Sequence, residues 1–182
     1  MPSEYQKFKF HTVLLHWIVG LGIIGLIAIG LYMAQNKAYA LYPIHKSIGV
    51  ILLGFIVVRV LFRIKEGWPK NISTGKKWEH ALAKIVHWVL ILGTLALPIS
   101  GVIMSYYGGH GVAVFGLEVL SKNYDPTLGR AIPINAEWSK TGSFVHEWAG
   151  KALIGVITLH VLGALKHHVL DKDNTLRRML GR

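Results

Sequence analysis

The chain has 182 residues, of which 52% are hydrophobic and only 16% are charged, against about a quarter in an ordinary soluble domain. It has ten histidines and no cysteine, which excludes disulfides, thiolate metal sites, iron–sulfur clusters and covalently attached haem. The formal net charge is +11, and in so apolar a chain its meaning depends on where the charges lie relative to membrane-length segments.

The first two apolar segments are long enough to cross a bilayer as helices. The segment from 10 to 36 contains no Asp, Glu, Lys or Arg, and predicts a span over about 12–34. The next segment has only Lys46 near its start and Arg59 near its end, and predicts a span over about 44–63. Both cations lie where a long side chain reaches the interface or a partner.

The second half of the chain predicts two more spans. Its first uncharged stretch is too long for one crossing, so we expect a helix over about 80–107 and an interfacial segment after it. Beyond a loop with two prolines, Thr141 or Ser143 is a suitable helix cap, and the last span runs over about 143–168. The four spans predict an all-α fold, an integral membrane four-helix bundle that forms a single domain over 1–182.

Lys and Arg near the ends of the spans predict the orientation. Most of their excess lies in the loop after the second span and in the C-terminal tail, whereas the other two loops carry few basic residues or balance them with acidic ones. The basic residues of the loop and tail are Arg63, Lys65, Lys70, Lys76, Lys77, Lys172, Arg177, Arg178 and Arg182. The positive-inside rule therefore predicts that the N-terminus and C-terminus are both cytoplasmic. We read the charge as an orientation signal and expect no nucleic-acid partner.

Several histidines fall within the expected spans. A histidine there is costly without a partner, so it indicates either a functional site or a hydrogen-bonded packing residue. Because successive spans run in opposite directions, His45 and His146 share the outer level, and His16 and His160 share the inner level. His87, on the third span, is the main rival at the inner level.

The spacing of two histidines on the last span predicts two separate metal sites. His160 follows His146 by 14 residues, which is close to four turns and about 21 Å, so both side chains leave the same helix face. A single metal cannot use both. Two haems, each held between opposed imidazoles, require this arrangement, and without thiols they would be b-type.

Room for a flat macrocycle is indicated by a small residue one turn after each of these four histidines. The small residues are Gly20 after His16, Gly49 after His45, Gly150 after His146 and Ala164 after His160. His87 instead has Ile91 at this position.

Two further side chains share these helix faces. Arg59 follows His45 by 14 residues and so lies at the inner level, where it would pair with a haem propionate; snorkelling to the headgroups is the alternative. His167 follows His160 by seven residues, nearer the cytoplasm, and is a candidate for exchanging protons with a quinone. An interfacial histidine without that role is the alternative.

Several segments together resemble the bacterial cytochrome b561 family. They are LHW at His16, PIHKSIG at His45, ALPISG at Pro98, VHEWAG at His146, LH at His160 and the closing KDNTLRRML. The resemblance covers nearly the whole chain. It implies a dihaem, multi-pass protein of the bacterial inner membrane, with His16 and His160 on one haem and His45 and His146 on the other, rather than His87.

The resemblance also implies electron transfer to or from quinone. We expect a superoxide:ubiquinone oxidoreductase that oxidises superoxide to oxygen at the periplasmic face and passes electrons through two haems b to ubiquinone. Lysines near the outer ends of the spans, Lys37, Lys46, Lys140 and Lys151, would attract the anion. Two alternatives stay open: a cytochrome b subunit that links a periplasmic redox enzyme to the quinone pool, and a histidine-lined ion transporter without haem.

Overall fold

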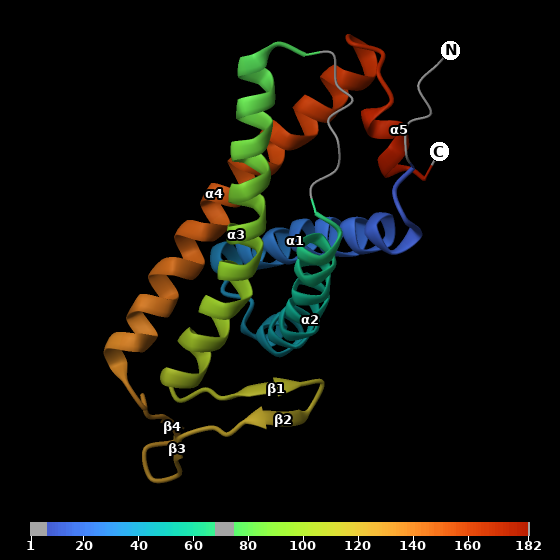
Figure 1. The fold of residues 1–182 in the computed structure, drawn as a ribbon. Coiled ribbons are helices and arrows are strands. Elements are labelled where there is room, and N and C mark those ends of the chain that lie inside the picture. The colour runs from blue at the N-terminus through green and yellow to red at the C-terminus, as the bar shows by residue number, and fades with distance from the viewer. Residues whose placement is uncertain (1–6, 68–74, 182) are drawn as a thin grey trace.

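A computed structural model describes residues 7–67 and 75–181. Lys70 and Arg182, two of the basic residues counted above, lie outside these ranges. Within the ranges, four helices are long and apolar enough to cross a membrane: α1 (Phe10–Asn36), α2 (Tyr42–Glu66), α3 (Lys77–Tyr107) and α4 (Ala136–Val169) (Figure 1). The expected all-α membrane four-helix bundle is confirmed.

Short elements connect and follow these helices. A 3-10 helix, η1 (Tyr39–Leu41), joins α1 to α2, and α5 (Thr175–Met179) follows α4. The α3–α4 connection holds two antiparallel pairs, β1 (Val112–Val114) with β2 (Leu117–Leu120) and β3 (Tyr124–Asp125) with β4 (Arg130–Ala131). The sequence predicts only an interfacial segment here, so the paired strands are a finding of the structure.

The long helices pack in chain order. α1 lies against α2, α2 against α3, and α3 pairs most extensively with α4, beside which it runs in Figure 1. In the described chain, α4 makes at most sparse backbone contact with α1 and α2. The backbone of α4 is therefore held apart from the α1–α2 pair.

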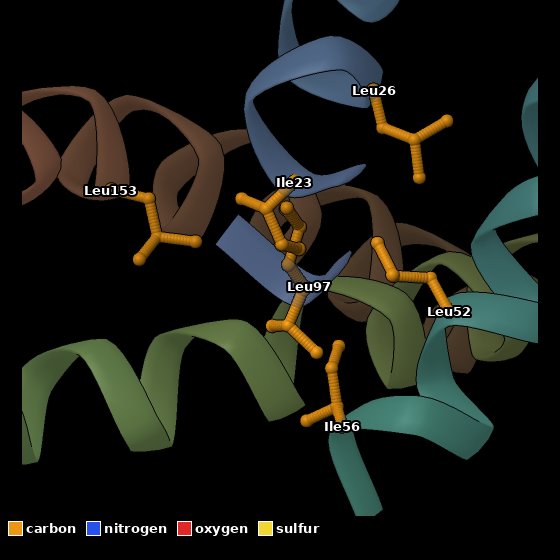
Figure 2. Close-up of a cluster of buried hydrophobic side chains, with 7 residues drawn as sticks. Ile23, Leu26, Leu52, Ile56, Leu97 and Leu153 are labelled. Carbon is orange, nitrogen blue, oxygen red and sulfur yellow. The ribbon is translucent and has the colours of Figure 1, made fainter. Parts of the chain in front are cut away.

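The buried core lies between the two histidine levels. Three of its members follow a candidate histidine by seven residues, two turns along the same face: Ile23 after His16, Leu52 after His45 and Leu153 after His146. Figure 2 shows these three side chains with Leu26, Ile56 and Leu97. An apolar layer therefore separates the two levels.

Glycines allow the core side chains to reach the facing helix. A Cβ on Gly22 would lie 2.8 Å from Leu52 Cδ1, and one on Gly93 would lie 2.9 Å from Leu153 Cδ2. Small residues of this kind are what helix association in a bilayer needs, because lipid tails are as apolar as leucine and close packing has to hold the helices together. The outer faces of the bundle expose large apolar side chains, including Leu61, Leu92 and Leu162, which a bilayer would cover.

The start of α4 differs from the expectation. The helix begins at Ala136, and its N-cap is Asn135, whose Oδ1 accepts hydrogen bonds from the backbone N–H groups of Glu137 (3.1 Å) and Trp138 (3.0 Å). Thr141 and Ser143 both lie inside the helix, so their prediction as caps is wrong. The apolar pattern marks only the membrane-length part of α4, whereas an amide side chain starts the helix earlier.

This cap makes a testable difference. Asn135→Ala should lower the free energy of unfolding by about 1 kcal/mol, because two backbone donors lose their acceptor. Ser143→Ala, at the rejected cap position, should change it by less than about 0.5 kcal/mol. Denaturant titration of the detergent-solubilised protein, followed by circular dichroism, measures both values. Equal losses in the two variants would contradict the assignment.

Candidate metal centres

Each long helix carries two site residues that are 14 positions apart in the sequence. Because 14 residues nearly complete four turns, the two members lie on one face, about 21 Å apart. The eight residues form two levels. The hairpin level, near β1–β2, is Gly30, His45, Gly101 and His146, and the tail level, nearer α5, is His16, Arg59, His87 and His160.

At the hairpin level, two imidazoles face each other between two glycines. The ring centres of His45 and His146 are 6.3 Å apart. A Cβ on Gly30 would lie 3.5 Å from His45 Cε1, and a Cβ on Gly101 would lie 3.0 Å from His146 Cε1. Because the two glycines have no side chains, they leave room for the imidazole rings of His45 and His146.

Hydrogen bonding leaves a nitrogen of His146 available to a metal. His146 Nδ1 lies 2.7 Å from the carbonyl oxygen of Leu97, to which it donates, so the lone pair is on Nε2. His45 Nδ1 is buried and has no hydrogen-bond partner among the described residues. Proteins rarely leave such an atom without an ion, a water molecule or a ligand.

The tail level holds three histidines. The ring centre of His160 is 6.1 Å from that of His16 and 5.3 Å from that of His87. Arg59 Nη2 lies 3.2 Å from His16 Nδ1, so its side chain turns to the inside of the bundle. This level contains one imidazole more than an axial pair of ligands requires.

A small cavity lies beside His16 and is lined by Thr12, Leu15, His16, Arg59, Phe62, Arg63, Glu66 and Met179. Met179 belongs to α5, which lies near the start of α1 in Figure 1. The indole Nε1 of Trp17 donates to the Met179 carbonyl at 2.7 Å. The C-terminal segment therefore forms one wall of this cavity.

Two other residues singled out in the sequence, His167 and Lys46, are not among the eight residues of the two levels. His167 Nδ1 is 2.9 Å from Oδ2 of both Asp171 and Asp173, two partners that the sequence analysis missed. Lys46 Nζ donates to Ser105 Oγ at 3.0 Å, and it has no acidic partner among the described residues.

Two of the four lysines expected to attract an anion are neutralised in ion pairs. Lys140 lies 3.2 Å from Glu137, and Lys151 lies 2.6 Å from Glu147. Of the other two, Lys37 and Lys46, only Lys46 is next to His45 in the sequence, so it presents its charge at the hairpin level.

Four apolar helices that bring two facing histidine pairs to two levels define a membrane protein whose histidines could hold metal groups inside the bundle. Residues 7–182 match the family model described as prokaryotic cytochrome b561, and the chain belongs to that family. It is a multi-pass electron-transfer protein of the bacterial inner membrane, and the family implies haem b.

Named relatives match over nearly their whole length. Cytochrome b561 homolog 2 of Escherichia coli strain K12 is 30% identical over 182 residues, covering 97% of this chain and 93% of the relative. Probable superoxide oxidase CybB of Yersinia pestis is 30% identical over 179 residues, covering 97% of each. Cytochrome b561 homolog 1 of E. coli K12 is 25% identical over 183 residues, covering 97% and 98%.

The residues at the two levels fit haem b. With a metal–nitrogen bond of about 2.0 Å on each side and a ring centre about 1.1 Å behind each nitrogen, two axial imidazoles have centres roughly 6 Å apart. The observed separations are 6.3 and 6.1 Å. A Cβ on Gly20 or Gly49 would meet no heavy atom within 4 Å, and one on Gly150 only Leu97 Cδ1 at 3.7 Å. There is thus open space one turn after His16 and His45, and no close contact one turn after His146.

Proposed function

We propose that the chain is a superoxide:ubiquinone oxidoreductase with two haems b. The overall reaction converts two superoxide anions to two molecules of oxygen, and one ubiquinone with two protons to ubiquinol. The observation that carries the proposal is that α4 supplies one histidine to each of two facing pairs, His146 to His45 and His160 to His16, with ring centres 6.3 and 6.1 Å apart. The relative named a probable superoxide oxidase supports the choice of substrate.

In this proposal His45 and His146 would hold one haem b, and His16 and His160 would hold the other. A haem b held by two histidines would supply one-electron transfer. The bond from His146 to the Leu97 carbonyl supports this role, since it fixes the ring and its tautomer. The ring centre of His87 is 5.3 Å from that of His160, less than the roughly 6 Å expected for two imidazoles that would bind one metal from opposite sides, which favours His16.

Arg59 has the charge to hold a propionate at the tail level. His16 can bind iron through Nε2 only when Nδ1 carries the hydrogen, and a guanidinium, which only donates, must then turn to another acceptor. A propionate carboxylate is the acceptor that fits, because Arg and carboxylate make charge-assisted hydrogen bonds.

The hairpin end would face the periplasm and the tail end the cytoplasm. The distribution of Lys and Arg supports this orientation, with both termini inside. Superoxide would then approach from the periplasm, where the half-buried ammonium of Lys46 attracts the anion towards His45. At the tail end, His167, which lies 2.9 Å from carboxylate oxygens of Asp171 and Asp173, would deliver a proton to the quinone.

Stopped-flow mixing with superoxide tests this function. The purified protein should show haem reduction within milliseconds, and ubiquinone should then reoxidise it. The rate should fall with rising salt, because the attraction is electrostatic. Absence of any haem absorbance change would contradict the superoxide role.

A matched pair of lysine variants separates steering from general charge. Lys46→Gln should slow haem reduction by about three- to tenfold and weaken its salt dependence. Lys65→Gln, an exposed lysine in the last turn of α2 at the opposite end, should leave the rate unchanged. Equal slowing in both variants would argue against a local role for Lys46.

A second candidate is a cytochrome b subunit of a periplasmic redox enzyme. The β1–β2 hairpin favours it, since Phe115, Leu117 and Val119 are exposed there and form a surface on which a partner could pack. Purification from native membranes discriminates the two: a stable redox partner, together with no reaction with superoxide, supports the subunit. A histidine-lined ion transporter without haem is supported only if the purified protein lacks a haem b spectrum.

A further inference from the structure

The end of α4 brings one imidazole and two carboxylates to a single point. His167 Nδ1 lies 2.9 Å from Asp171 Oδ2 and 2.9 Å from Asp173 Oδ2. A ring nitrogen carries at most one hydrogen, so it can donate to only one of the two carboxylates. The three ligand atoms lie within 4.8 Å of one another, close enough to share one metal ion.

Asp173 provides a second and separate indication of a ligand. Its side chain is only 8% exposed, and its Oδ1 accepts a hydrogen bond from the backbone N–H of Thr175 at 2.8 Å. Its Oδ2 is buried and accepts no hydrogen bond from any described residue, so its approach to His167 lacks hydrogen-bond geometry. A buried carboxylate oxygen without a donor is unfavourable, and a cation at this point would satisfy it.

We propose that His167, Asp171 and Asp173 bind a divalent transition-metal cation, with Zn²⁺ as the best match. Zn²⁺ takes imidazole nitrogen and carboxylate oxygen together, and with three protein ligands it keeps a fourth position for water. Mg²⁺ and Ca²⁺ prefer sites built from oxygen alone. The imidazole therefore selects a transition metal.

The neighbouring lysine is compatible with a cation. Lys166 Nζ lies 3.0 Å from Asp171 Oδ2 and also 3.0 Å from Glu79 Oε2. When Asp171 turns to the metal, Lys166 keeps its pair with Glu79. The metal would then hold the turn after α4 that leads to α5.

The metal site does not depend on the proposed function, because none of its ligands is a proposed haem ligand. If both hold, Zn²⁺ occupies the imidazole that would deliver a proton to the quinone, and added Zn²⁺ slows quinone reduction. Metal binding is measured without turnover, so the two proposals fail separately.

The test uses the full-length holoprotein in detergent, with any histidine tag removed and Zn²⁺ as the probe. Equilibrium dialysis with metal analysis should find one tightly bound Zn²⁺ per chain in the wild type. Asp173→Asn should weaken this binding by at least about tenfold, and Asp171→Asn should act in the same direction. His168→Gln is the matched control, since this exposed neighbour is not part of the cluster.

Two results would overturn the proposal. One is folded wild-type protein that binds no Zn²⁺ at about 0.1 mM metal. The other is equal Zn²⁺ affinity in the wild type and in the two aspartate variants. Circular dichroism and the haem spectrum establish that each variant is folded. If an aspartate variant does not fold, Zn²⁺ binding by the wild type alone tests the proposal.

Discussion

His146→Ala should remove one haem and leave the other in place. The two histidine levels have separate ligands, and the layer of Ile23, Leu52 and Leu153 lies between them. With about 21 Å between the levels, a change in one leaves the ligands of the other untouched, as expected for sites without shared partners. The variant should therefore carry half the haem of the wild type, measured as pyridine haemochrome per mole of protein.

The matched control for His146→Ala is His168→Ala, an exposed histidine at the far end of the same helix. It should keep the full haem content. Loss of both haems from a His146→Ala protein that retains its helical circular dichroism and elutes as a single species would contradict two independent centres. Full retention of both would exclude His146 as a ligand.

His16→Ala and His87→Ala should separate the two rivals at the tail level. His16→Ala should lose the tail-level haem or convert it to a high-spin form, because one axial ligand is missing. His87→Ala should keep both haems in their low-spin form. Absorption and electron paramagnetic resonance spectra report these outcomes.

His16→Ala and His87→Ala are easier to tell apart in the His146→Ala background, where only the tail-level haem is expected to remain. Adding His16→Ala should then leave no low-spin haem, whereas adding His87→Ala should leave the remaining haem unchanged. The reverse result would assign the ligand to His87 and would show that its 5.3 Å approach to His160 is the significant one.

The spacing of residues along the chain predicts much of this arrangement. Helix periodicity is local, so a separation of 14 residues puts His146 and His160 on one face whatever the rest of the chain does. The depth of a residue in a span is also fixed by its position. Position alone therefore puts His45 level with His146, and puts His16 and its rival His87 level with His160. In the structure the His45 and His146 rings lie 6.3 Å apart, and the His160 ring lies 6.1 Å from His16 and 5.3 Å from His87.

The same 14-residue spacing also links a histidine to a glycine on α1 and on α3, and the sequence analysis did not use it there. Gly30 follows His16 by 14 residues, and Gly101 follows His87 by 14. These glycines make room for the rings of His45 and His146. A glycine in an apolar helix can serve many roles, and its role becomes clear only when the structure shows which side chain faces it. The Leu97 carbonyl that orients His146 leaves no signal in the sequence, since every residue has one.

What the sequence by itself determined is the membrane-spanning fold, the number of spans and the level of each histidine, because hydropathy and helix periodicity act over one segment at a time. The tertiary structure decided which side chains meet across segments. It turned Arg59 to His16, brought His87 beside His160 and folded Asp171 and Asp173 back onto His167. Such contacts depend on the rotation and tilt of whole helices, which packing between neighbours sets and no single segment encodes.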